Sequence, residues 1–128
     1  MEISFTDREL DVMAVLWKRG SGTVAEVRDA LHDDLAYTTV LTVLRTLQEK
    51  GYVFHAVEGR AHRYRPAVTQ RAAGGTALSR VLDKIFDGSS ELLLTQLVSD
   101  RKLGDDELER LRDMLDEKLV TAKKRGKR

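Results

Sequence analysis

Apolar residues recur with a helical period over residues 6–50 and predict three short helices there. The first begins at Thr6, where Glu9 completes a capping-box pattern, and ends before Gly20. The second begins with the same pattern at Thr23 and Glu26. The apolar positions of these two helices are Leu10, Met13, Leu16, Trp17, Val24, Val27, Ala30 and Leu31. Each helix therefore has one side that can pack into a core and one side that faces water.

A third helix is predicted over residues 37–50, although its threonines and valines are mediocre helix formers. One face packs on the first two helices and consists of Val40, Val43, Leu44 and Leu47. The opposite face consists of Thr38, Thr39, Thr42, Arg45, Thr46 and Glu49. Threonine lets a helix approach DNA closely and contacts phosphates or base edges, while arginine pairs with guanine or phosphate. This face is a candidate DNA-binding surface; the alternative is a neutral face exposed to solvent.

A β-hairpin is predicted after the third helix, because a period-two pattern replaces the helical one. Its strands are residues 52–57 and 62–65, its turn surrounds Gly59, and Pro66 ends the second strand. Three short helices followed by a hairpin are the element order of a winged helix-turn-helix domain. The fold class predicted is therefore mainly α, an α+β winged helix, with the third helix in the major groove of DNA.

Three arginines make the hairpin basic. Arg60 lies at the tip, where a wing can reach a phosphate or a minor groove. Arg63 and Arg65 share one face of the second strand. They are either DNA contacts or charges that protect an edge strand from aggregation. We include Arg60 and Arg63 among the candidate DNA-binding residues, with Arg60 the stronger candidate.

The remainder of the chain predicts three more helices, each with an apolar stripe. They carry more leucine than a short tail could bury within itself, which predicts a homodimer. The candidate dimerisation residues are Leu78, Leu82, Ile85, Leu92, Leu93, Leu97, Leu108, Leu111 and Leu115. The alternative is that these helices fold back on the winged domain. The predicted organisation is a DNA-binding domain at 1–71, a helical dimerisation domain at 72–120 and a basic flexible tail at 121–128.

The charge distribution agrees with a nucleic-acid partner. The net charge of the 128 residues is only +1, but basic side chains are in excess over residues 35–71 and acidic ones over residues 1–34. There is no cysteine, and neither a signal-peptide pattern nor an apolar run of membrane-spanning length is present. The chain is therefore expected to be soluble and cytoplasmic, without membrane insertion.

The residues predict neither an enzyme nor a cofactor or metal site. No Ser/His/Asp grouping and no phosphate-binding loop is present. His55 and His62 could approach each other across the hairpin, but no cysteine or carboxylate cluster accompanies them.

Several motifs together resemble the BlaI/MecI family of penicillinase repressors. They are TDRELDVMAVLW, TVAEVRDAL, AYTTVLTVLRTLQEKGY, GRAHRYRP and ELERLRDMLDE, within about residues 4–117. The resemblance implies a homodimer whose N-terminal winged helices bind a palindromic operator and whose C-terminal helices form the dimer. It also implies repression of β-lactamase or related resistance genes. In this family a membrane-bound sensor metalloprotease is associated with cleavage of the repressor in its fifth helix, and the cleaved repressor releases DNA.

Two positions depart from that family. Ala36 stands where members often have a capping serine at the start of the recognition helix. The cleavage point would fall at Gln96–Leu97, where members with known cleavage carry an Asn-Phe type pair. A transcriptional repressor is the expected function; a winged helix used only for protein–protein contact is the alternative.

Overall fold

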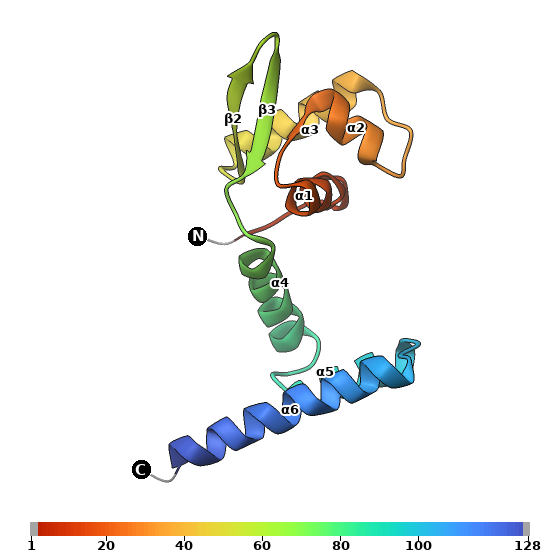
Figure 1. Ribbon diagram of the computed structural model, residues 1–128, viewed down its shortest axis with the longest axis vertical. Helices are drawn as coiled ribbons and strands as arrows, with labels where there is room; N and C mark the ends of the chain where they lie inside the picture. Colours follow the sequence, from red (N-terminus) through yellow and green to blue (C-terminus); the bar gives the residue numbers. More distant parts are fainter. Residues whose placement is uncertain (1–2, 127–128) are drawn as a thin grey trace. The chain divides into compact units, whose positions relative to one another are not determined.

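The computed structural model describes residues 3–126, which form six helices and a three-stranded sheet (Figure 1). The elements in chain order are α1 Asp7–Arg19, β1 Gly22–Thr23, α2 Val24–Ala30, α3 Tyr37–Glu49, β2 Val53–Glu58, β3 Ala61–Pro66, α4 Gln70–Lys84, α5 Ser90–Asp100 and α6 Asp105–Gly126. They confirm the predicted mainly α winged-helix fold. Two compact units divide the chain between Val81 and Leu82, within α4. We call the first the winged unit and the second the C-terminal unit.

The start of each of the first two helices is stabilised as predicted. Thr6 Oγ1 accepts the N–H of Glu9 (3.2 Å), and the Glu9 carboxylate accepts the N–H of Thr6 (2.8 Å). Thr23 and Glu26 repeat this reciprocal arrangement at α2. Gly20 ends α1 with a φ of 86°, a left-handed conformation that glycine adopts without steric cost.

The sheet is antiparallel, in the order β1-β3-β2, and contains a strand that the sequence did not predict. β1 has two residues, with Gly22 opposite Tyr64 and Thr23 opposite Arg63. A Cβ added to Gly22 would come within 3.0 Å of Val27 Cγ2, so glycine allows this close packing of β1 on α2. Two residues are too short for a period-two pattern, which is why this strand was missed.

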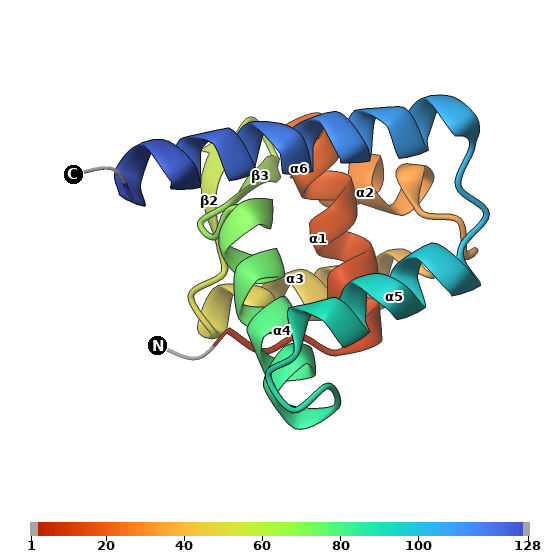
Figure 2. The same cartoon turned by 90° about the horizontal axis from the view of Figure 1, so that it is seen from below.

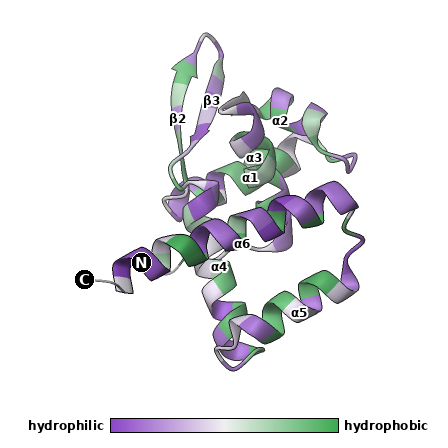
Figure 3. Cartoon of the chain, turned by 60° about the horizontal axis from the view of Figure 1, so that its bottom comes forward, coloured by the Kyte–Doolittle hydropathy of each residue, from purple (hydrophilic) through white to green (hydrophobic). Residues whose placement is uncertain are grey.

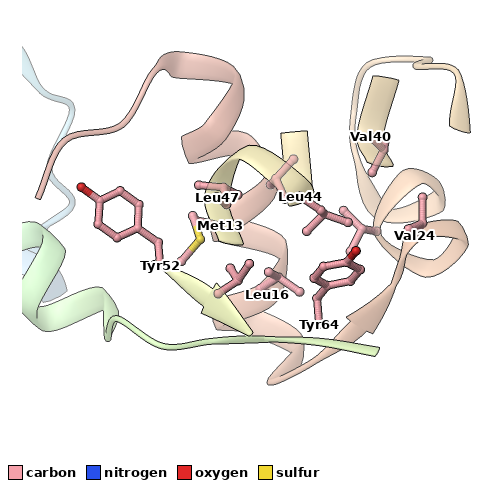
Figure 4. Close-up of a cluster of buried hydrophobic side chains, with 11 residues drawn as sticks. Met13, Leu16, Val24, Val40, Leu44, Leu47, Tyr52 and Tyr64 are labelled. Carbon is pink, nitrogen blue, oxygen red and sulfur yellow. The ribbon is translucent and has the colours of Figure 1, made fainter. Parts of the chain in front are cut away.

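The core of the winged unit is drawn from α1, α2, α3, β2 and β3 (Figure 4). Its members are Val12, Met13, Leu16, Val24, Val27, Val40, Leu44, Leu47, Tyr52, Val53 and Tyr64. Leu10, predicted on the apolar face of α1, is instead 41% exposed. Trp17 packs against the core, and its Nε1 donates to the carbonyl of Val68 (2.8 Å). This bond ties α1 to the segment that follows the wing.

An ion pair between a buried carboxylate and a partly exposed lysine joins the first helix to the end of the third. Glu9 is only 4% exposed, and its carboxylate lies 2.8 Å from Nζ of Lys50, the residue that ends α3. The same carboxylate accepts the Thr6 N–H, so the charge is both paired and hydrogen-bonded, as a buried charge requires. The pair fixes the end of α3 against the start of α1.

The C-terminal unit contains α5 and α6, which run in opposite directions (Figure 2). Ser89 caps α5 by accepting the N–H of Leu92 (3.2 Å). Apolar positions occur along both helices (Figure 3), yet within residues 3–126 no residue of either helix is buried. In the same described range, no helix is long and apolar enough to cross a membrane.

Two of the later helices extend further than their local sequence suggests. α4 continues without interruption through Gly74 and Gly75, although glycine is a poor helix former. The predicted flexible tail, residues 121–128, is helical as far as Gly126, and its last two residues lie outside the described residues. The basic residues in the last turn of α6 interact favourably with the helix dipole, which explains the extension.

Candidate nucleic-acid interface

The third helix divides as its sequence predicts into a buried face and an accessible face. Val40, Leu44 and Leu47 are fully buried and anchor it in the core. The candidate DNA-binding residues Thr38, Thr39, Thr42 and Arg45 are exposed, and Thr46 is half-buried. Packing of the apolar face therefore offsets the modest helix propensity of this segment and leaves the threonines available to a partner.

Two threonine hydroxyls of this face are engaged within the helix. Thr42 Oγ1 donates to the carbonyl of Thr38 (2.9 Å), and Thr46 Oγ1 donates to the carbonyl of Thr42 (3.0 Å). Each oxygen keeps lone pairs that can accept a hydrogen bond, but its proton is already committed. These two residues are therefore ready to accept from a base amino group or to offer a methyl group, and less ready to donate to a phosphate. Periodicity alone could not reveal this preference.

The start of α3 lacks the caps that stabilise α1 and α2. Ala36 has an extended backbone (φ −66°, ψ 148°), and in the part of the chain described no side chain caps this end. The N–H groups of Thr39 and Val40 both bond to the Ala36 carbonyl (3.1 and 3.2 Å). The first turn contains no acidic residue. The positive end of the helix dipole and the first N–H groups are therefore left to bind an anion.

Arg45 lies where the accessible face of α3 meets the wing. Burial raises the pKa of the Tyr64 phenol on β3, and the positive charge of Arg45 acts against this rise, so the two groups are within electrostatic reach. Arg45 therefore adds positive charge near the wing.

The tip of the wing carries Arg60 next to Gly59, whose φ of 63° forms the turn. The Arg60 side chain is exposed and makes no ion pair with any residue between 3 and 126. An exposed, unpaired guanidinium at the end of a hairpin can meet a phosphate without first breaking an internal contact.

Arg63 differs from Arg60 because its charge is already compensated. Its guanidinium lies 2.9 Å from the Glu26 carboxylate and 2.8 Å from that of Glu58, and it donates to Ser21 Oγ (3.1 Å). The hydrogen bonds with Glu58 and Glu26 hold the pKa of Arg63 above its usual range. Arg63 therefore joins β2 and β3 to the start of α2. The sequence showed Glu26 only as a capping residue, because these contacts depend on the folded chain.

The two histidines predicted to approach each other do so. The rings of His55 and His62 stack with centroids 4.2 Å apart and planes 7° from parallel. His55 Nδ1 forms a hydrogen bond with Oε1 of Gln48, near the end of α3. Across residues 3–126 no cluster of three or more side chains that could hold a metal ion is found. The pair thus contributes to the contact between the wing and α3.

The candidate dimerisation residues are largely accessible within the chain. The exposed ones are Leu78, Ile85, Leu92, Leu97, Leu108 and Leu115, and the half-buried ones are Leu82, Leu93 and Leu111. Ile85 is the most accessible of them, at 71% exposed. Exposed apolar side chains in this number are typical of an interaction surface.

The candidate cleavage point lies within a regular helix. Gln96 and Leu97 are both exposed residues of α5. The Leu97 carbonyl accepts the N–H of Arg101 (3.3 Å), and Gln96 Nε2 donates to Asp100 (3.2 Å). A protease that binds an extended substrate would have to break these hydrogen bonds, so accessibility of the side chains is not sufficient for cleavage.

The sequence and the fold are similar to known DNA-binding regulators. The model of the penicillinase repressor family matches residues 5–117. The chain is 37% identical over 115 residues to the transcriptional regulator BlaI of Mycobacterium tuberculosis, covering 87% of this chain and 82% of that protein. It is 27% identical over 114 residues to a penicillinase repressor of Bacillus licheniformis, covering 88% and 89%. The solution structure of the DNA-binding domain of the repressor BlaI aligns with a TM-score of 0.50 and 33% identity, covering 55% of this chain and 88% of that one.

Proposed function

This chain belongs to the penicillinase repressor family, and on that basis we propose that it is a sequence-specific DNA-binding transcriptional repressor. We infer that it binds a palindromic operator as a homodimer and controls β-lactamase or related antibiotic-response genes. Its relatives include a transcriptional regulator and a penicillinase repressor, which supports a regulatory role.

The observation that carries the proposal is the accessible, uncapped face of α3. Its first N–H groups are available to a backbone phosphate, which the helix dipole also attracts. A phosphate at this end would set the position of the helix, and the short threonines would allow it to lie deep in the major groove. Thr42 and Thr46 would accept from base amino groups or contact thymine methyls, and Arg45 would pair with guanine.

We infer different roles for the two wing arginines, Arg60 in DNA contact and Arg63 in holding the wing. Arg60 would contact a phosphate or the minor groove, since its guanidinium has no internal partner among residues 3–126. Arg63 would hold the wing in place through Glu26 and Glu58 rather than contact DNA directly. If Arg63 contacted DNA, its ion pairs with Glu26 and Glu58 would be broken, so Arg63 is a weaker candidate for DNA contact than Arg60.

The exposed leucines of α4, α5 and α6 support the homodimer. A twofold dimer buries the same patch on both subunits and presents two recognition helices to two half-sites, about one turn of DNA apart. A palindromic operator then mirrors the symmetry of the protein. Two half-sites bound together also gain affinity through effective concentration.

We also propose that the repressor is inactivated by cleavage at Gln96–Leu97, with a membrane sensor metalloprotease as the partner that triggers it. Cleavage there would interrupt α5, which carries several of the candidate dimerisation leucines. Loss of the dimer would lower operator affinity without damage to the winged unit. Because the bond is helical, cleavage requires local unfolding of α5 first.

The test of the proposed function is selection of duplexes from a random pool by the full chain. Selected duplexes are expected to contain an inverted repeat and to bind about 10³-fold or more tightly than a scrambled duplex at the same salt concentration. The affinity should fall with salt by about 0.9 log units per log unit for each phosphate contacted. Thr42→Ala and Arg45→Ala should reduce the preference for the selected duplex. Equal binding of selected and scrambled duplexes would contradict the proposal.

A further inference from the structure

A cavity of about 660 Å³ opens on the winged unit between α1 and the end of α2. Its walls are formed by residues 8–19 of α1 and by residues 30–33, which lead from α2 toward α3. Small-molecule sites have volumes of roughly 300–1,000 Å³, and this cavity falls within that range. None of the proposed DNA contacts or dimerisation leucines is part of its lining.

Part of the cavity lining is apolar and is supported by the core. Ala14 and Val15 line it from α1, and Ala30 and Leu31 line it from the end of α2. Val15 and Leu31 also pack against the buried core, so this surface is supported from behind. Such a surface fits the flat apolar body of a small organic molecule.

Most of the charge around the cavity is already neutralised. Arg8 Nη1 lies 2.8 Å from the Asp33 carboxylate and 3.6 Å from that of Asp11. Arg19 lies 3.6 Å from Glu26, which is not in the lining. The Arg8–Asp33 pair also joins the two walls. Both arginines of the lining are therefore engaged, Arg8 by two carboxylates within the lining and Arg19 by a carboxylate outside it.

Two polar groups of the lining remain without partners. Lys18 and His32 make no ion pair or hydrogen bond with any residue that the structure describes. The lining cation that remains free is therefore the Lys18 ammonium on α1, and the His32 ring, on the wall formed by residues 30–33, adds an N–H donor. We propose that this cavity binds a small amphipathic organic anion, a carboxylate on an aromatic or alicyclic body, with Lys18 and His32 as the partners of the carboxylate.

A charge-matched series of probes tests this site in the full chain. The ¹⁵N-labelled protein is titrated with 1-naphthoate, with the neutral 1-naphthylmethanol and with the cationic 1-naphthylmethylammonium, and amide shifts are followed by NMR. Naphthoate should shift the amides of Ala14, Val15, Ala30 and Leu31 saturably, and it should bind about threefold to tenfold more tightly than the alcohol. The ammonium probe should bind most weakly. Lys18→Gln should remove the preference for the anion.

Two alanine variants separate this cavity from other apolar surface. Ala14→Phe fills the cavity and should abolish the naphthoate shifts. Ala25→Phe changes an exposed alanine of α2 outside the lining and should leave them unchanged. Equal affinity for the three probes, unchanged binding to Ala14→Phe, or shifts confined to α4–α6 would overturn the proposal. So would amide shifts of the lining residues that depend on protein concentration without a probe, since a second copy would then occupy the cavity.

Discussion

The winged unit buries many of its apolar side chains in a core of its own, whereas the helices of the C-terminal unit do not. Eleven residues form a buried core in the winged unit, while within the described range α5 and α6 contribute no buried residue. Both regions carry apolar stripes at helical spacing, so periodicity alone does not distinguish them. The difference is whether the partner surface lies within the same unit. The winged unit should therefore be stable on its own, and the stability of the C-terminal unit should depend on formation of the proposed dimer.

The largest effect is expected in the core. Leu44→Ala removes a fully buried side chain and should lower the free energy of unfolding of the winged unit by about 2–5 kcal/mol. The loss should be the same at low and high protein concentration, because the contacts are internal to the unit. Urea unfolding followed by Trp17 fluorescence at two concentrations measures it. A concentration-dependent loss would mean that this core is shared between chains.

The next largest effect is expected on dimer affinity when an exposed leucine of α6 is replaced. Leu115→Asp should weaken the proposed dimer by about 2–3 kcal/mol, or about 30-fold to 150-fold in Kd, because a charge would be buried without a partner. Sedimentation equilibrium measures the change. The matched control is Leu10→Asp, since both leucines are moderately exposed but Leu10 lies on the winged unit. If both variants remain as dimeric as the parent, the leucines of α6 do not form the interface.

Acid should weaken the winged unit through Glu9. Burial raises the pKa of Glu9, but hydrogen bonds from Lys50 and Thr6 and the charge of Lys50 outweigh it and hold the pKa below its ordinary value. The ionised form therefore stabilises the fold above the unfolded-state pKa of about 4.3, and this contribution is lost as the pH falls through the lower folded-state pKa.

Glu9→Gln isolates this contribution. The variant should lose about 1–2 kcal/mol at neutral pH, and its stability should change less between pH 6 and pH 3 than that of the parent. Unfolding curves across this pH range measure both effects. Glu91→Gln, an exposed change in α5, provides the control. Parallel pH profiles of the parent and Glu9→Gln would show that the Glu9–Lys50 pair is not the acid-sensitive element.

The features that the sequence could predict are those that depend on neighbouring residues, and those it could not predict depend on contacts between distant segments. Both capping boxes were predicted correctly, because each consists of two residues three positions apart. The hairpin and the buried face of α3 likewise follow from local periodicity. β1 and the Arg63 contact with Glu26 were missed, because they join segments distant in sequence. Whether a leucine stripe is covered within its own chain is also a tertiary property, and no local pattern contains it.

A smaller effect is expected when either wing arginine is replaced, on DNA affinity for Arg60 and on stability for Arg63. Arg60→Ala should weaken binding to all duplexes similarly, by about 0.5–1 kcal/mol, and lower the salt slope by about one phosphate contact, with no loss of stability. Arg63→Ala should instead loosen the wing, because Glu26 and Glu58 lose their shared partner. Duplex titration at several salt concentrations and thermal unfolding distinguish the variants. A reduced salt slope for Arg63→Ala with unchanged stability would assign Arg63 to DNA contact.

The smallest effect is expected at the start of α3, where the winged unit leaves its own backbone groups without a cap. Ala36→Ser should provide the missing side-chain acceptor and stabilise the free protein by about 0.5–1 kcal/mol. In the parent, amide exchange at Thr38 should slow when DNA binds, because a phosphate would take the place of the cap, whereas the Thr39 N–H is already bonded to the Ala36 carbonyl. In Ala36→Ser the Thr38 amide should already be protected without DNA, so the added protection on binding should be smaller. Equal protection of Thr38 in free and bound parent protein would show that no phosphate caps this helix.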